Sequence, residues 1–295
     1  MTFEAWLATC ETALTLHTTS RVHQTHAGAH RSSHLGKGLR LHHHEEYHPG
    51  DTRSSIDWKI SRKEHALLLQ RFEEDKHLEV IALCDVSASM LFGRHHAKHR
   101  ITLDCAGLLG LAALRQGNAF GLLAFAAEAV AHFPPHQRRG AMLQALEYLW
   151  AYESSEQPPT DTALSPVLRY LPTQRPLLVC ILSDFRMPDW QEALASLSAM
   201  HDTIPVLIED EAEATLESLG RIVVRDLESG RFVELDTTSA VYRRAYREQA
   251  LAERSAREQF FQRYCGAQYV VATHATDYRL ELLRLFLART ARAWT

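Results

Sequence analysis

Two runs of aliphatic residues, each ending at a polar turn, constrain the fold of this chain most strongly. The first covers residues 78–84 and is followed by Asp85, and the second covers residues 176–182 and is followed by Ser183 and Asp184. Short apolar runs with almost no charge are typical of strands buried on both faces of a parallel sheet. Because open α/β sheets bind ligands at the carboxyl ends of their strands, both aspartates are predicted to lie at that edge.

Strand and helix patterns alternate from residue 78 to residue 288, which predicts an α/β fold with a doubly wound, mostly parallel, Rossmann-like sheet. Further strands are expected at 119–125, 129–133, 204–208 and 268–272, an edge hairpin at 221–224 and 231–235, and helices at 96–116, 138–152, 162–170, 190–200, 238–264 and 277–288. Upstream we expect a helix at 3–17, a long polar loop at 23–53 and a strand at 67–72. Residues 1–76 are thus predicted to be an N-terminal extension and residues 77–295 the sheet domain.

Composition excludes several classes of protein. The 295 residues carry a formal net charge of -4, so no domain-wide basic field exists to collect nucleic-acid phosphates. No apolar run reaches the roughly 18 residues that a membrane span needs, and the first residues lack the pattern of a signal peptide. Five widely spaced cysteines are typical of a reducing compartment. We therefore expect a cytoplasmic protein, which a partner could still recruit to a membrane.

The turn after the first run carries three oxygen side chains at alternating positions, Asp85, Ser87 and Ser89. A carboxylate and two hydroxyls are hard donors that suit Mg²⁺, Mn²⁺ or Ca²⁺ rather than zinc or copper. The alternative interpretation is a turn that only caps the following helix.

This Asp-x-Ser-x-Ser pattern resembles the metal-ion-dependent adhesion site of von Willebrand factor type A domains. The resemblance implies two further loops, and Thr160 and Asp184 are the matching residues. It implies that Ser87, Ser89 and Thr160 bind the ion directly, with Asp85 and Asp184 acting mostly through water. The ion would keep an open position for an Asp or Glu carboxylate of a protein partner.

Residues 46–58, with the sequence EYHPGDTRSSIDW, resemble the signature of the bacterial domain of unknown function 58 family, and Gly36, Gly38, Gly93 and Lys98 fit the same pattern. The resemblance covers roughly residues 20–290. It implies a non-enzymatic, cation-dependent protein-interaction module that acts with a MoxR-type AAA+ ATPase in the assembly or maturation of other proteins. His43 and Glu45, and Pro159 before Thr160, depart from the family pattern.

Two short patterns also suggest enzymatic functions. His44-Glu45-Glu46-Tyr47-His48 matches a zinc protease motif, but that motif needs a helix, and Pro49-Gly50 follows at once. Asp85 is also placed like the nucleophile of haloacid-dehalogenase phosphatases, although Ser87 stands where their second aspartate is needed. A metal-dependent phosphatase or hydrolase therefore remains the alternative to an interaction module.

Overall fold

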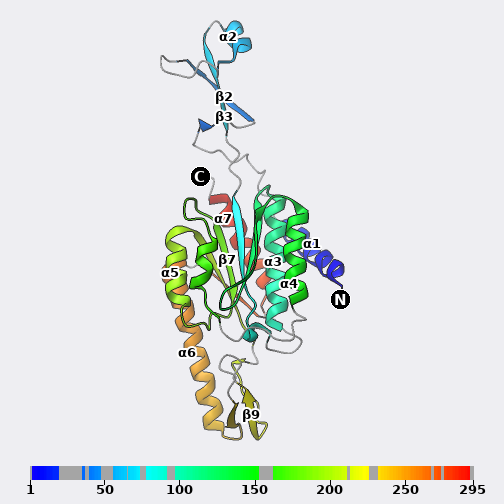
Figure 1. The fold of residues 1–295 in the computed structure, drawn as a ribbon, viewed down its shortest axis with the longest axis vertical. Helices are drawn as coiled ribbons and strands as arrows, with labels where there is room; N and C mark the ends of the chain where they lie inside the picture. The colour runs from blue at the N-terminus through cyan, green and yellow to red at the C-terminus, as the bar shows by residue number, and fades with distance from the viewer. Residues whose placement is uncertain are drawn as a thin grey trace. The chain divides into compact units, whose positions relative to one another are not determined.

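The structure is a computed structural model that describes residues 2–19, 35–36, 40–47, 56–64, 66–73, 78–91, 97–152, 162–210, 213–225, 232–266, 269–273 and 276–292 (Figure 1). The chain divides into two compact units. The larger unit comprises residues 1–23 and 78–287, and the smaller comprises residues 24–77 and 288–295.

A six-stranded sheet forms the centre of the larger unit, with the strand order β11-β8-β7-β4-β5-β6. Four neighbouring pairs of strands run parallel, and β6 pairs antiparallel with β5 at the edge. Pro134 and Pro135 lie in β6, and an edge strand tolerates prolines because its outer backbone groups need no partner. The strands are β4 (Glu79–Asp85), β5 (Ala119–Phe125), β6 (Ala129–His136), β7 (Leu178–Ser183), β8 (Asp202–Ile208) and β11 (Val270–Ala272).

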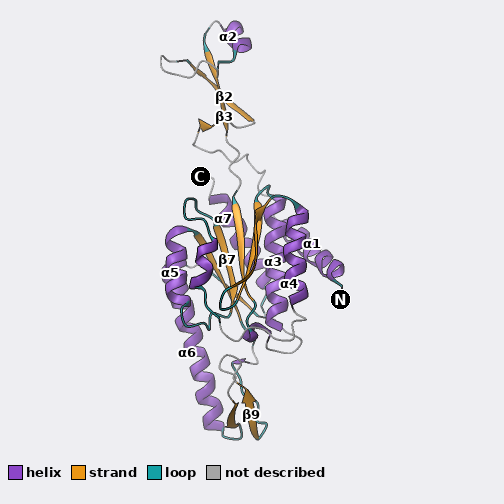
Figure 2. Ribbon diagram, viewed as in Figure 1, coloured by secondary structure: helices purple, strands orange, loops and turns teal. Residues whose placement is uncertain are grey.

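Helices cover both faces of this sheet (Figure 2). Along β4, Val80 and Ala82 contribute to the core under one helical layer, while Ile81 and Leu83 contribute to the core on the other side. This alternation explains why the strand is apolar at almost every position. The first layer contains α1 (Phe3–Thr19), α3 (Ala97–Arg115), α4 (Arg139–Tyr152) and α7 (Tyr278–Arg292), and the second contains η3 (Ser165–Tyr170), α5 (Trp190–Met200) and α6 (Ala240–Cys265).

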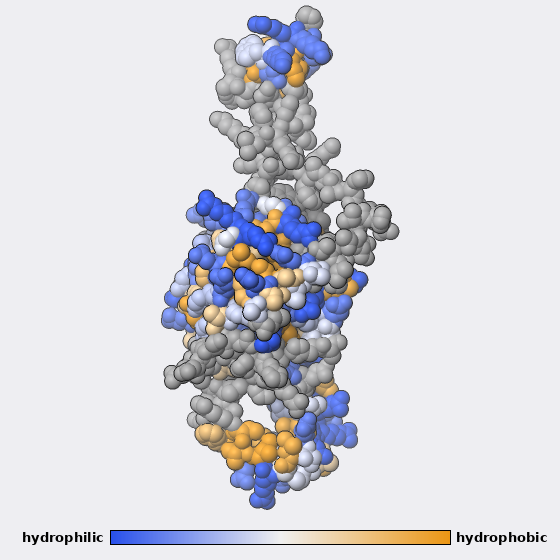
Figure 3. All heavy atoms as spheres, turned by 90° about the vertical axis from the view of Figure 1, so that its right-hand side faces the viewer, coloured by the Kyte–Doolittle hydropathy of each residue, from blue (hydrophilic) through white to orange (hydrophobic). Residues whose placement is uncertain are grey.

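An antiparallel hairpin of β9 (Arg221–Arg225) and β10 (Phe232–Asp236) precedes α6. Its apolar side chains are unusually exposed, with Phe232 at 73% and Val223 at 67% (Figure 3). A two-stranded ribbon has no core of its own, so these side chains have nothing within the hairpin to bury them.

The smaller unit contains a three-stranded antiparallel sheet with the order β1-β3-β2. A short helix lies between β2 and β3 in the chain. Ile56 bridges to Leu69 of β3, and the Asp57 carboxylate accepts from the backbone N–H groups of Lys59 and Ile60 at 3.1 and 3.2 Å. Within the sequence signature, Ile56 thus joins the chain before the helix to β3, and Asp57 caps the N-terminus of the helix. The elements are β1 (Leu35–Gly36), β2 (Arg40–Glu46), α2 (Trp58–Glu64) and β3 (Leu68–Glu73).

The predicted fold class is confirmed, but several elements differ from expectation. The polar region 23–53 was expected to be a loop, yet it contains β2, whose backbone pairs with β3 across a bulge between Leu41 and His43. Since β2 holds His44–Glu46 in extended backbone, these residues do not form the helix that a zinc protease motif requires. The helix expected at 162–170 is a shorter 3₁₀ segment that begins with Ser165 and Pro166.

Helix α1 lies with the sheet, because Trp6 Nε1 donates to Asp104 of α3 at 2.7 Å and the Trp6 ring joins the main core. The sequence-based boundary at residues 76/77 places this helix in the extension instead, and that division into domains stays a prediction.

Candidate functional site

Asp85 ends β4 and organises the turn that follows it. Its Oδ1 accepts from the backbone N–H of Ser87 at 3.0 Å and from the Ser87 hydroxyl at 2.6 Å. The hydroxyl oxygens of Ser87 and Ser89 lie 3.1 Å apart, where η2 (Ala88–Leu91) begins. The alternating spacing thus brings all three predicted oxygen side chains into one small volume.

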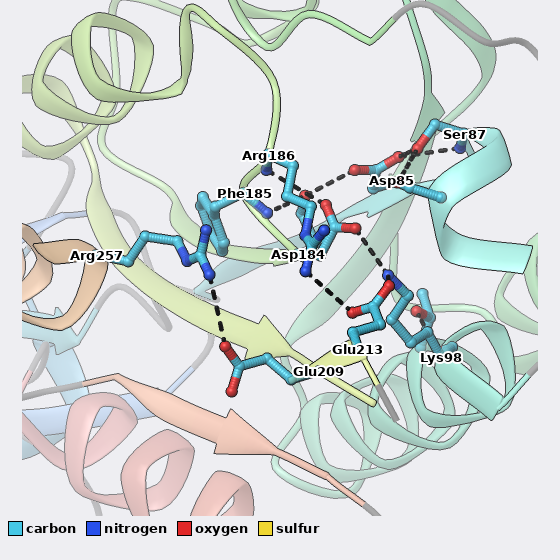
Figure 4. Close-up of polar contacts among 12 residues, drawn as sticks. Asp85, Ser87, Lys98, Asp184, Phe185, Arg186, Glu209, Glu213 and Arg257 are labelled. Atoms are coloured by element: carbon cyan, nitrogen blue, oxygen red, sulfur yellow. Dashed lines mark hydrogen bonds and ion pairs between the residues drawn. The ribbon is translucent and has the colours of Figure 1, made fainter. Parts of the chain in front are cut away.

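The neighbouring strand supplies the second part of the site. Because β4 and β7 are adjacent and parallel, their carboxyl ends meet. The Ser183 hydroxyl donates to Asp85 Oδ2 at 2.6 Å, and Ser89 lies close enough to Asp184 to help lower the pKa of that carboxyl. Two strand ends that lie about one hundred residues apart in the sequence therefore share one hydrogen-bond network (Figure 4).

Phe185 holds the loop after β7 in an unusual conformation. Its φ of 51° places a bulky residue in the left-handed region, which costs backbone energy and is common near functional sites. The Phe185 N–H donates to Ser183 Oγ at 3.0 Å, and the buried ring packs edge-on against Phe261 of α6 and Trp190 of α5, at centroid distances of 4.9 and 5.8 Å. Packing against two helices thus fixes the direction of the Asp184 loop.

A buried lysine occupies the inner side of the site. Lys98 Nζ donates to Asp184 Oδ2 at 2.9 Å and to Glu213 Oε1 at 2.7 Å, and its side chain has no exposed surface. The other Glu213 oxygen, Oε2, lies 3.4 Å from Arg186 Nη2. Lys98 therefore joins α3 to the Asp184 loop and to the segment after β8 (Figure 4).

The two aspartates differ in electrostatic environment. Burial, together with the nearby Asp184 charge, raises the pKa of Asp85 to about 6, although Ser183 and Ser87 oppose the rise. Burial would also raise the pKa of Asp184, but the Lys98 ammonium outweighs it and holds that pKa below its ordinary value. The negative charge of Asp85 is thus poorly compensated within the protein, and this is the charge that a bound cation would neutralise.

The donor set fits a small hard cation. Two cis ligands of Mg²⁺ at about 2.05 Å lie about 2.9 Å apart, close to the 3.1 Å between the Ser87 and Ser89 hydroxyl oxygens. Within the described residues, no cluster of three or more His, Cys, Asp or Glu side chains has the arrangement of a metal site. A cation site at this edge therefore depends on hydroxyl ligands.

Four of the five residues predicted for the site come together: Asp85, Ser87, Ser89 and Asp184. The fifth, Thr160, lies outside the described residues. Sequence reasoning gave no role in the site to Lys98, Ser183 or Glu213. A lysine in the first turn of a helix of small apolar residues was a usable signal for Lys98, whereas nothing local distinguishes Glu213 from other acidic residues.

The chain is similar in sequence to proteins of mycobacteria. An uncharacterized protein of Mycobacterium tuberculosis strain H37Rv is 24% identical over 248 residues, which cover 82% of this chain and 77% of that protein. An uncharacterized Mycobacterium avium protein is 28% identical over 129 residues, which cover 43% of this chain and 74% of that protein.

Among solved structures, the conserved hypothetical protein BatB from Bacteroides thetaiotaomicron aligns with a TM-score of 0.45 at 14% identity, covering 73% of this chain and 99% of that one. The SpRpn10 von Willebrand factor type A domain aligns with a TM-score of 0.38 at 9% identity, covering 70% of this chain and 94% of that one.

None of the described helices combines the length and apolar content that crossing a membrane requires. The family profile for proteins of unknown function DUF58 matches residues 43–256, most of the chain, and the protein therefore belongs to the DUF58 family.

Proposed function

We propose that this protein is a non-enzymatic, divalent-cation-dependent interaction module that binds an acidic side chain of a partner protein. Ser87, Ser89 and Thr160 would bind Mg²⁺, or Mn²⁺ or Ca²⁺, with Asp85 and Asp184 acting mostly through water. The observation that carries the proposal is the convergence of two hydroxyls and two carboxylates at the ends of β4 and β7, with Asp85, Ser87 and Asp184 buried and Ser89 half-buried. When bound, the ion would supply an electrophilic position for a carboxylate oxygen.

The charge balance favours an acidic partner group. Asp85, Asp184 and Glu213 contribute three negative charges, and Lys98 and Arg186 contribute two positive ones, which leaves one net negative charge. A divalent cation changes this sum to one net positive charge. One Asp or Glu carboxylate from a partner would restore neutrality, which supports binding of a single acidic side chain.

The surroundings of Asp85 support binding rather than covalent catalysis. Its side chain is completely buried, and both oxygens accept hydrogen bonds, from Ser87 and from Ser183. A carboxylate nucleophile needs a free oxygen facing its substrate, and phosphatases on similar sheets use a general acid where Ser87 stands.

The family resemblance supports a MoxR-type AAA+ ATPase as the partner, in assembly or maturation of other proteins. The exposed apolar side chains of the β9–β10 hairpin are a second observation in favour of a protein partner, because soluble monomers rarely leave clustered large apolar groups in water.

The test measures binding between the purified full chain and a purified MoxR-type ATPase of the same organism, in Mg²⁺ and in EDTA. The variant combines Asp85→Ala with Ser87→Ala, and the control Asp236→Ala removes an exposed carboxylate of β10. We expect binding only with Mg²⁺ and only for wild type and control. Titration of Mg²⁺ into each protein, followed calorimetrically, shows separately whether the ion binds.

Two results would count against the proposal. Equal binding in Mg²⁺ and EDTA, or by the double variant after circular dichroism shows that it is folded, would remove the cation from the mechanism. Mg²⁺-dependent hydrolysis of p-nitrophenyl phosphate by wild type, lost in the double variant, would instead establish a phosphatase.

A further inference from the structure

A cleft of about 330 Å³ lies between the Asp184 loop, the segment after β8 and one face of α6. Its lining carries four arginines and four carboxylates, so its formal charges sum to zero. Arg247, Arg254 and Arg257 all come from α6, where spacings of seven and three residues place side chains on one face. Arg186 joins them from the Asp184 loop.

Arg257 is the most unusual of these side chains because it is buried while one of its donors lacks an acceptor among the described residues. The residue is 8% exposed, and its Nε has no acceptor within the described part of the chain. Its Nη2 lies 3.7 Å from Glu209 Oε1, an ion-pair distance beyond that of a hydrogen bond. A guanidinium presents five donors, and a buried Nε–H without an acceptor is costly, so this side chain favours an additional oxygen ligand.

The carboxylates of the cleft do not meet that demand. Glu209 is shared, since its Oε2 lies 3.4 Å from Arg254 Nη1 while Oε1 faces Arg257. Glu213 is already engaged by Lys98 and Arg186. Arg247 is exposed and pairs with no other described residue. Arg254 is engaged as well, since its Nε donates to Glu258 Oε1 at 2.9 Å. Among the α6 arginines of the cleft, Arg247 and the Nε of Arg257 therefore keep donors without an acceptor in the described part of the chain (Figure 4 shows Arg257 and Glu209).

We propose that this cleft is a second binding site, which takes a small phosphate-bearing molecule whose phosphate oxygens accept from Arg247, Arg254 and Arg257. A phosphate group offers more oxygens and more charge than a carboxylate, which matches several guanidinium forks better. The volume admits a phosphate together with a small organic group. The three proposed phosphate ligands belong to α6 and none of them is part of the cation site, although Arg186 and Glu213 border both sites.

The experiment titrates inorganic phosphate into the full chain by calorimetry, at constant ionic strength and in EDTA, so that no metal at the Asp85 site can bind the anion. Acetate serves as the carboxylate arm. The main variant is Arg247→Met, whose exposed side chain should be removable without loss of folding. Arg257→Met is the second variant, with folding checked by circular dichroism. The matched control is Arg244→Met, an arginine of α6 that pairs with Glu248 and does not line the cleft.

We expect saturable phosphate binding, at least about tenfold weaker acetate binding, and a loss of about tenfold or more in phosphate affinity for Arg247→Met and for folded Arg257→Met, because each removes a charge-assisted donor. Arg244→Met should bind as wild type does. The proposal is overturned if wild type shows no phosphate binding tighter than about 10 mM. Equal affinity for acetate, or equal losses in Arg244→Met and Arg247→Met, would overturn it as well.

Discussion

Replacement of Lys98 by methionine tests whether the buried ammonium holds the candidate site together. Methionine keeps most of the apolar stem but removes the charge and both hydrogen bonds, to Asp184 at 2.9 Å and to Glu213 at 2.7 Å. The lysine side chain is fully buried, and the exposed fractions of the Asp184 and Glu213 side chains are 3% and 12%. Solvent therefore cannot replace the lost partner at Asp184.

Removing one partner of a buried ion pair costs about 3–5 kcal/mol, chiefly because a charge is left buried and uncompensated. We expect the free energy of unfolding of Lys98→Met to fall by about 3 kcal/mol, the lower end of that range, because Glu213 retains Arg186 at 3.4 Å. The assay is urea unfolding followed by circular dichroism in EDTA at pH 7. Lys59→Met, an exposed lysine of α2, is the control and should change stability by less than about 0.5 kcal/mol.

The pH dependence gives an independent check. In wild type the pKa of Asp184 is lowered, because Lys98 outweighs the effect of burial. A lowered folded pKa contributes stability above the unfolded value of about 3.9, and this contribution is lost as the pH falls through the folded value. In Lys98→Met, burial without the ammonium should raise the Asp184 pKa instead. The stability gap between the two proteins should therefore narrow on acidification from pH 7 to pH 5.

Two results would refute this reasoning. A loss below about 1 kcal/mol would mean that the ammonium is effectively solvated and that its contacts contribute little. A gap that widens on acidification would mean that Asp184 is not the charge left uncompensated. Adding Glu213→Gln to Lys98→Met removes the charge of the second carboxylate that has lost its lysine partner and should recover part of the loss, so a purely additive double variant would also contradict the network.

The other predictions concern backbone contacts. Gly121→Ala should destabilise the protein by about 1–3 kcal/mol in thermal or urea unfolding, because the new Cβ would lie 2.7 Å from Pro135 N and 2.8 Å from Phe133 O, backbone atoms that cannot rotate away. Gly140→Ala, in α4 with open space around it, should be neutral or stabilise by up to about 1 kcal/mol; equal losses for both glycines would contradict this account. Asp189→Ala removes two acceptors for backbone N–H groups, at 3.0 and 2.7 Å, and should cost about 1–2 kcal/mol at pH 7. Although burial opposes them, those hydrogen bonds lower the Asp189 pKa, so the cost should disappear as the pH falls through that lowered value, and a pH-independent cost would contradict this prediction.

Local pattern in the sequence determined the framework of this protein. The apolar runs at 78–84 and 176–182 became β4 and β7, and the polar residues after them lie at the carboxyl ends of those strands. Asp85, Ser87 and Ser89 could be grouped in advance because alternating positions of a single turn bring their side chains together. Strand β2 could not be predicted from local pattern, because its sequence has little apolar alternation and the strand is stabilised by its pairing with β3.

The charge environment of the site was decided by tertiary structure alone. Lys98 meets Glu213 across 115 positions of sequence, and Ser183 meets Asp85 across 98. Such contacts depend on how strands order within the sheet and on which helix covers each face, and no periodic pattern encodes either. The same holds for Arg257: its position on α6 is local information, but its burial beside a single shared carboxylate arises only when that helix packs against the end of β8.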